Sequence, residues 1–240
     1  MTPTPASAAP PDHQVHQWLA AWARSLADHD IAACVHLFHP DACWRDLVAF
    51  SWNIVTADGH AAIARMLEAT AAHTGASQWA LDGPATEAGG DVEAWIRFDT
   101  AAGRGRGILR LREGRAWTLF TTLQELRGFE EPAGDRRARG VVHAALRNRT
   151  TWAEERAAEA ATLGIQTQPY CLVVGGGQGG IGLAARLKRL GVPTLVIDRL
   201  DRPGDAWRRR YKTLCLHDPV WYDHLPYLPF PDHWPVFTPK

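Results

Sequence analysis

The stretch from Tyr170 to Arg199, YCLVVGGGQGGIGLAARLKRLGVPTLVIDR, constrains the fold of this chain more than any other part of its sequence. The apolar run YCLVV is typical of a strand buried on both faces of a sheet. Gly175, Gly177 and Gly180 follow it at the spacing G-x-G-x-x-G, and the residues after them predict a helix. A second apolar run, TLVID, follows the helix. The order predicts a strand–helix–strand unit.

The glycine spacing predicts a site for the pyrophosphate of a dinucleotide. The first glycine permits a tight turn, the second lets the backbone approach the pyrophosphate, and the third lets the helix pack against the strand. The helix N-terminus directs N–H groups and a positive dipole end at the same place. The residues predicted to bind the cofactor in this loop are Gly175, Gly176, Gly177, Gln178, Gly179 and Gly180.

Asp198 ends the second predicted strand, 21 residues after Gly177. A carboxylate at this position accepts hydrogen bonds from ribose hydroxyls and would repel a 2′-phosphate. The unit is therefore predicted to bind FAD or NAD. The alternative is a glycine-rich turn in an ordinary βαβ unit that binds no nucleotide.

The segment after Asp198 is rich in proline and aromatic residues, whereas an NAD dehydrogenase would continue with another helix and a third parallel strand. From residue 168 to 240 the chain resembles the flavin-containing monooxygenases, especially the bacterial and plant branch that includes the auxin-forming enzymes. The matching motifs are VVGGGQGGIGLA, VIDR, GDAWRRRYKTLCLHDP and LPYLPFP. The resemblance implies FAD at the glycine loop and its reduction by NADPH. It also implies oxygen transfer through a flavin hydroperoxide to a small organic substrate.

The same resemblance implies roles for three further residues. Ala206 and Trp207 occupy the place of the family's Gly-Gly-x-Trp turn beside the ribityl chain, although Asp205 stands where the second glycine would be. His217 falls where many relatives carry an asparagine next to the flavin ring, so it would have to act as an N–H donor. It is a weak catalytic candidate. For Trp207 and His217 the alternative is packing beneath a long loop.

The family also carries a second glycine fingerprint, for NADPH, and a further motif between the two loops. Neither occurs in these 240 residues. We therefore expect residues 168–240 to be an incomplete α/β Rossmann-type FAD-binding segment, with the NADPH site beyond residue 240, and the chain to be inactive by itself.

Residues 13–128 predict an α+β domain. Apolar residues at helical spacing predict three helices, and alternating runs after Gly75 predict strands joined by short turns. This order, with the segment LFHPDACWRDLVAFSW, resembles the SnoaL-like, nuclear-transport-factor-like fold, in which helices and a curved antiparallel sheet form a cone around a pocket. Residues 1–12 predict a flexible leader. Residues 129–167 predict a linker and a connecting helix, which starts at a capping-box pattern of Thr151 and Glu154.

Asp46 is the candidate catalytic residue of this domain, because relatives of the cone fold move protons with an acid or a His–Asp pair. A carboxyl group beside Trp44 and Trp52 suits general acid or base chemistry. The alternative is an ion pair with Arg45 or with an arginine of the opposite strands, such as Arg97 or Arg110.

Three functions are consistent with these patterns. The first is the N-terminal portion of an FAD-dependent monooxygenase that uses NAD(P)H. The second is a non-catalytic ligand-binding or dimerisation module. The third is a SnoaL-like isomerase or cyclase that acts through Asp46.

Composition argues against several partners. Lys plus Arg and Asp plus Glu both number 26, and the isoelectric point is about 7.2, so no overall field would attract nucleic acid or an anionic membrane. The sequence has no signal peptide pattern and no apolar run of the ~18 residues that a membrane span needs. The four cysteines and the histidines show no disulfide or metal-ligand spacing. We expect a reduced cytoplasmic protein with a small-molecule substrate and no metal. From the resemblance to cone folds we also expect a homodimer that forms through the α+β domain, because the exposed sheet faces of such folds often pair.

Overall fold

A computed structural model describes residues 9–138, 140 and 149–240, and it divides the chain into two units, Met1–Glu130 and Glu131–Lys240. Of the leader predicted at residues 1–12, residues 1–8 lie outside the described residues. The first helix already begins at Pro11.

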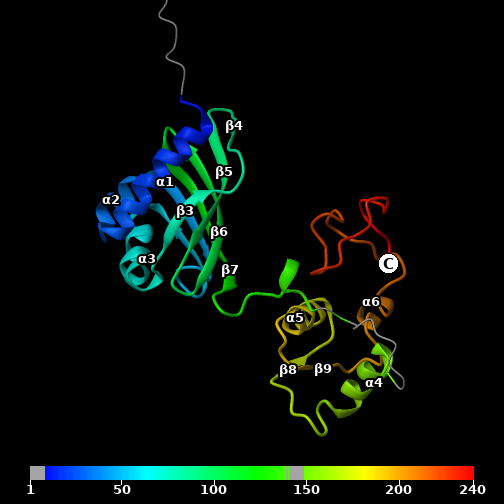
Figure 1. Cartoon of the computed structure of the whole chain (residues 1–240). Helices are drawn as coiled ribbons and strands as arrows, with labels where there is room; N and C mark the ends of the chain where they lie inside the picture. The colour runs from blue at the N-terminus through cyan, green and yellow to red at the C-terminus, as the bar shows by residue number, and fades with distance from the viewer. Residues whose placement is uncertain (1–8, 139, 141–148) are drawn as a thin grey trace, which may run out of the picture. The chain divides into compact units, whose positions relative to one another are not determined.

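Three helices pack against one face of the sheet in the first unit (Figure 1): α1 (Pro11–Ala27), α2 (Ile31–His36) and α3 (Gly59–Thr74). The buried side of α1 has the helical spacing read from the sequence and consists of Val15, Trp18, Leu19, Trp22 and Leu26. The second helix begins at an N-cap, Asp30, whose carboxylate accepts the Ala33 N–H at 2.8 Å.

The sheet of the first unit has seven strands in the order β2-β1-β7-β6-β5-β3, with β4 paired to β5. The strands are β1 (Phe38–Leu47), β2 (Ile54–Asp58), β3 (Ser77–Leu81), β4 (Thr86–Ala88), β5 (Asp91–Asp99), β6 (Gly103–Arg112) and β7 (Arg115–Leu126). The expectation of an antiparallel sheet is wrong, because β1 pairs with β7 in parallel and the curved sheet is mixed. Parallel neighbours need a crossover connection. Here the chain between β1 and β7 passes through α3 and the other strands before it returns beside β1.

Aromatic side chains fill the space between the helices and the sheet. Trp22 is fully buried, stacks on Trp18 with 5.3 Å between ring centroids and meets Trp44 edge-on at 5.6 Å. Trp79 stacks on Phe98 at 4.4 Å. Such rings bury large apolar areas in preferred geometries, so the interior of this unit is a packed core.

The second unit is built around two parallel strands, β8 (Cys171–Val174) and β9 (Thr194–Ile197), which are joined by helix α5 (Gln178–Arg189). The unit also contains the 3-10 turn η1 (Gly134–Arg136), helix α4 (Trp152–Thr162) and the short helix α6 (Asp205–Arg208). The capping box at Thr151 and Glu154 is formed at the start of α4, as the sequence predicts.

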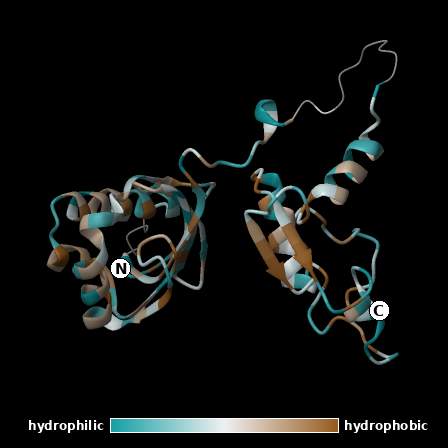
Figure 2. Ribbon diagram, turned by 90° about the horizontal axis from the view of Figure 1, so that it is seen from below, coloured by the Kyte–Doolittle hydropathy of each residue, from teal (hydrophilic) through white to brown (hydrophobic). Residues whose placement is uncertain are grey.

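Only one side of the β8–β9 pair is covered within the described residues. Val173 is 8% exposed, whereas Leu172 is 53% and Val174 79% exposed. Figure 2 shows both strands in the colour of hydrophobic residues. A two-stranded sheet is marginally stable alone, so the packing of helix α5 on this pair matters for its stability.

Polar contacts hold the C-terminal tail and the start of the unit together. The Glu131 carboxylate accepts the Tyr227 hydroxyl at 2.7 Å and pairs with Arg186 of α5. At the other end of the tail, the Lys240 ammonium donates to the Arg210 carbonyl at 2.7 Å. The tail therefore packs on the βαβ unit although it has little regular secondary structure.

Candidate nucleotide-binding site

The glycine loop lies between the end of β8 and the start of α5. Gly175 has a φ of +107°, where glycine is strongly favoured, and its N–H donates to the Ile197 carbonyl at 2.7 Å. A Cβ on Gly180 would lie 1.8 Å from the Gly175 carbonyl oxygen. A Cβ on Gly177, in contrast, would meet no protein atom within 4 Å. The local fold therefore requires the first and third glycines of the motif, whereas the second adjoins open space.

Helix α5 begins at the loop. Gly177 is its N-cap residue, and the Ile181 N–H closes the first turn by donating to the Gly177 carbonyl at 2.9 Å. The first N–H groups of any helix have no acceptor inside the helix, and they coincide with the positive end of the dipole. These N–H groups can bind an anion such as a pyrophosphate.

Asp198 connects the end of β9 to the glycine loop. One carboxylate oxygen accepts the Gly176 N–H at 2.6 Å, and the other accepts the Leu200 N–H at 2.7 Å. These two backbone hydrogen bonds, with a smaller effect of the Arg199 charge, hold the pKa of Asp198 below its ordinary value. The group is thus a carboxylate at neutral pH, and each of its oxygens keeps a lone pair for a further donor.

A pocket of about 520 Å³ adjoins the loop and the end of β9. It is lined by Val174, Gly175, Gly177, Ile197, Asp198, Arg199, Leu200 and Ala206. The structure thus brings Gly175, Gly177, Asp198 and Ala206 from the predicted set into one pocket. The remaining loop residues of that set are neighbours in the chain at the start of α5: Gly176, Gln178, Gly179 and Gly180.

Sequence reasoning missed the other half of the lining. Val174 and Ile197 are the last residues of their strands, and Arg199 and Leu200 directly follow Asp198. The signal was available, because ligands of parallel α/β sheets bind outside the carboxyl ends of the strands.

Trp207 and His217 lie outside this lining. Trp207 is 40% exposed, and the His217 side chain is exposed and forms no hydrogen bond with any residue that the structure describes. Their roles next to a flavin stay predictions from the resemblance.

The second candidate, Asp46, is fully buried in the first unit. One of its oxygens accepts the Thr121 hydroxyl at 2.7 Å, and Thr121 in turn accepts the Trp44 indole N–H at 2.9 Å. The other oxygen accepts the hydroxyl and the backbone N–H of Ser51, at 2.7 and 2.8 Å. The carboxylate therefore ties the turn between β1 and β2 to the neighbouring strand β7.

The alternative of an ion pair between Asp46 and Arg45, Arg97 or Arg110 is wrong, because the partners of the carboxylate within the described residues are Phe50, Ser51 and Thr121. Arg45 points to the other face of β1 and donates to Thr56, and Arg110 pairs with Glu93. The physical reason is the alternation of side chains along a strand, which places Arg45 and Asp46 on opposite faces of the sheet. Trp52, which is 63% exposed, does not cover the carboxylate in the way that the sequence suggested.

In the described part of the chain, no three His, Cys, Asp or Glu side chains come together as a metal site. None of the helices in the described residues is long and apolar enough to cross a membrane.

Comparison with known proteins gives partial matches. No family model matches the chain. It is 41% identical over 73 residues to the indole-3-pyruvate monooxygenase YUCCA1 of Oryza sativa subsp. japonica, a match that covers 30% of this chain and 18% of the relative. It is 41% identical over 70 residues to the probable indole-3-pyruvate monooxygenase YUCCA9 of Arabidopsis thaliana, covering 29% of this chain and 17% of that protein. The chain thus spans less than a fifth of the length of these curated relatives.

Among solved structures, the chain is similar to an NTF2-like protein with a cystatin-like fold from Novosphingobium aromaticivorans. The sequence identity is 20% and the TM-score 0.34, over 47% of this chain and 81% of that one.

Proposed function

We propose that this chain is the FAD-binding N-terminal portion of a flavin-dependent monooxygenase that uses NAD(P)H. The observation that carries the proposal is the pocket in which the open space beside Gly177 meets the carboxylate of Asp198. The sequence identity to part of the indole-3-pyruvate monooxygenases supports the proposal, because it suggests which reaction class a dinucleotide bound at this site would serve. The substrate is a small organic molecule of unassigned structure.

The residues present fit the ADP half of FAD. The absent side chain at Gly177 leaves room for a pyrophosphate, and the first N–H groups of α5 supply donors for its charge. The free lone pairs of Asp198 suit the two hydroxyls of a ribose, and its negative charge opposes a 2′-phosphate. When bound, FAD supplies the oxygen-transfer chemistry, and this segment supplies binding and orientation.

Asp46 has no part in this proposal. Its two oxygens accept hydrogen bonds from Thr121 and from the 50–51 turn, so it acts as a structural anchor of the first unit.

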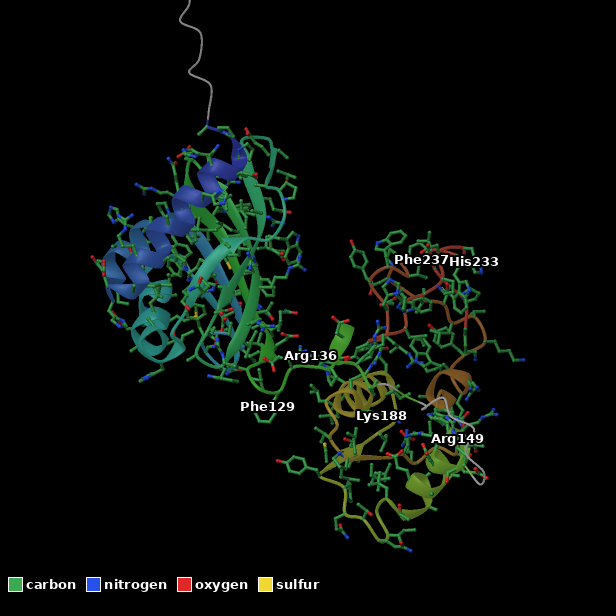
Figure 3. All side chains as sticks on the ribbon, viewed as in Figure 1. Phe129, Arg136, Arg149, Lys188, His233 and Phe237 are labelled. Carbon is green, nitrogen blue, oxygen red and sulfur yellow. The ribbon has the colours of Figure 1, made fainter. Side chains whose placement is uncertain are left out.

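A leucine at position 177 tests the proposal. We expect Gly177→Leu to abolish FAD binding, measured by quenching of flavin fluorescence on titration with the whole chain, while the circular dichroism spectrum stays unchanged. Lys188→Leu is the matched control, because Lys188 is an exposed residue of the same helix outside the pocket (Figure 3). ADP should compete with FAD for the wild-type chain. Equal FAD affinity of the two leucine variants would refute the assigned site.

A further inference from the structure

The turn that carries Ala206 is held by an unusual buried charge. Asp205 is 5% exposed, although it stands in a tail segment whose neighbours are exposed. One of its carboxylate oxygens accepts hydrogen bonds from Arg202 and Arg208, both at 2.9 Å. Its other oxygen lies 4.0 Å from the Arg209 guanidinium. A carboxylate is buried at low cost only when it is paired in this way.

These hydrogen bonds turn the Asp205 side chain away from the nucleotide pocket. Ala206 lines the pocket, whereas Asp205 does not. Arg208 also donates to the Pro203 carbonyl at 2.8 Å and packs over Gly204, whose φ is +84°. The residue that replaces a glycine in this turn therefore leaves the pocket open, because arginines outside the pocket bind its side chain.

The segment between the two parts of the lining, residues 198–200 and Ala206, is consequently fixed at both ends by a carboxylate. Asp198 holds the beginning through Gly176, and Asp205 holds the end through Arg202 and Arg208. The hydrogen bond from Arg202, and then that from Arg208, keeps the pKa of Asp205 below its ordinary value, so the charge is present at neutral pH.

We propose that Asp205 is a positioning residue of the nucleotide site, which holds the turn of residues 202–208 in the one conformation that places Ala206 in the pocket wall. This inference rests on the proposed FAD site. Asp205 itself does not contact the nucleotide in this proposal. It acts through Arg208.

The test uses the whole chain with Asp205→Ala, Asp205→Glu, Arg208→Ala and the double variant Asp205→Ala/Arg208→Ala. Asp201→Ala is the matched control, because Asp201 is an exposed carboxylate of the same segment outside the pocket lining, and among the described residues it pairs with the exposed Arg209. Two quantities are measured: the Kd for FAD, and the amide hydrogen exchange of residues 204–209 without FAD.

We expect Asp205→Ala to raise the Kd for FAD about tenfold and to speed the exchange of the Trp207 and Arg209 amides about tenfold, because one charge-assisted network holds this turn. Asp205→Glu, which keeps the carboxylate, should restore the Kd to within roughly threefold of wild type. The double variant should bind FAD no more weakly than Asp205→Ala, because residues that act through one another are not additive. Asp201→Ala should change neither quantity by more than about twofold.

The outcomes separate this inference from the function on which it rests. If wild type binds FAD and Asp205→Ala binds it equally well, Asp205 is not a positioning residue, while the proposed function stands. If wild type binds no FAD, the proposed function fails, and the exchange measurement decides by itself whether Asp205 holds the turn. Additive losses in the double variant would show that Asp205 does not act through Arg208.

Discussion

The backbone N–H of Gly176 donates a 2.6 Å hydrogen bond to the carboxylate of Asp198, so the glycine loop and the end of β9 are joined directly. The same carboxylate is the proposed acceptor for the ribose. We expect Asp198→Asn to weaken FAD binding roughly tenfold, because a charge-assisted hydrogen bond becomes a neutral one. A flavin titration measures this effect, with Asp232→Asn as an exposed control in the tail. Unchanged affinity would show that Asp198 serves only the loop.

Asp198 should also make the stability of the second unit depend on pH in the acid range. Because its pKa in the folded protein lies below the ordinary value, the stabilisation is present above about pH 4 and is lost as the pH falls through the lower, folded pKa. The unfolding temperature of the wild-type chain should fall between pH 5 and pH 3, which lie about one unit above and below the ordinary pKa of an aspartate. We expect this fall to be smaller in Asp198→Asn. An unchanged acid dependence in the variant would contradict the hydrogen bonds to Gly176 and Leu200.

Alanine substitutions separate the two kinds of glycine in the loop. Gly180→Ala should destabilise the second unit by about 2 kcal/mol or more, because its Cβ would overlap the Gly175 carbonyl oxygen. Gly177→Ala should cost about 1 kcal/mol or less, since its Cβ meets no protein atom and only the N-cap preference of glycine is lost. Denaturant unfolding of both variants checks the difference. Equal destabilisation would mean that the loop is packed differently.

Asp46 should matter for the stability of the first unit. We expect Asp46→Asn to lower the free energy of unfolding by about 1–3 kcal/mol, because an amide cannot accept all the hydrogen bonds from Ser51, Phe50 and Thr121. Asp41→Asn, an exposed position on the same strand, is the control. Tryptophan fluorescence in urea measures both. A variant as stable as wild type would remove the anchor role from Asp46.

Cys34 should be unreactive in the folded chain. Burial, with a smaller effect of Asp30, raises the pKa of this thiol to about 12, and the side chain is completely buried in the core. At pH 8 we expect iodoacetamide to leave Cys34 unmodified in native protein and to modify it in urea, because the thiolate is the nucleophile. The stabilisation from the neutral thiol is present below the unfolded pKa of about 8.5 and is lost as the pH rises towards 12. Mass analysis that found native Cys34 alkylated as fast as Cys171 would contradict its burial.

The sequence predicted those parts of the fold that depend on local pattern. Helix α5 and strands β8 and β9 follow from glycine spacing and apolar runs, and the capping box at Thr151 follows from four residues. The parallel pairing of β1 with β7 was not predictable in this way, because it depends on which strands meet after the chain has passed through five other elements of the sheet and α3.

The candidate site shows the same division. The glycines and Asp198 were found because their chemistry requires a fixed spacing along the chain. The buried state of Asp205 was not found, because it depends on arginines three residues before and after it that both donate to its carboxylate. For Asp46, the neighbouring Arg45 and the arginines of the opposite strands suggested an ion pair, whereas strand alternation directs the carboxylate to Thr121 and the turn at residues 50–51. The homodimer, the NADPH site and the cytoplasmic location stay predictions.

The most direct test of a nucleotide site at the glycine loop is amide hydrogen exchange of the whole chain with and without FAD. We expect FAD binding to slow the exchange of the amides from Gly175 to Ile181 and from Asp198 to Ala206, with the amides of residues 9–130 unchanged. Protection confined to the first unit, or no protection in a folded chain, would contradict a nucleotide site at the glycine loop.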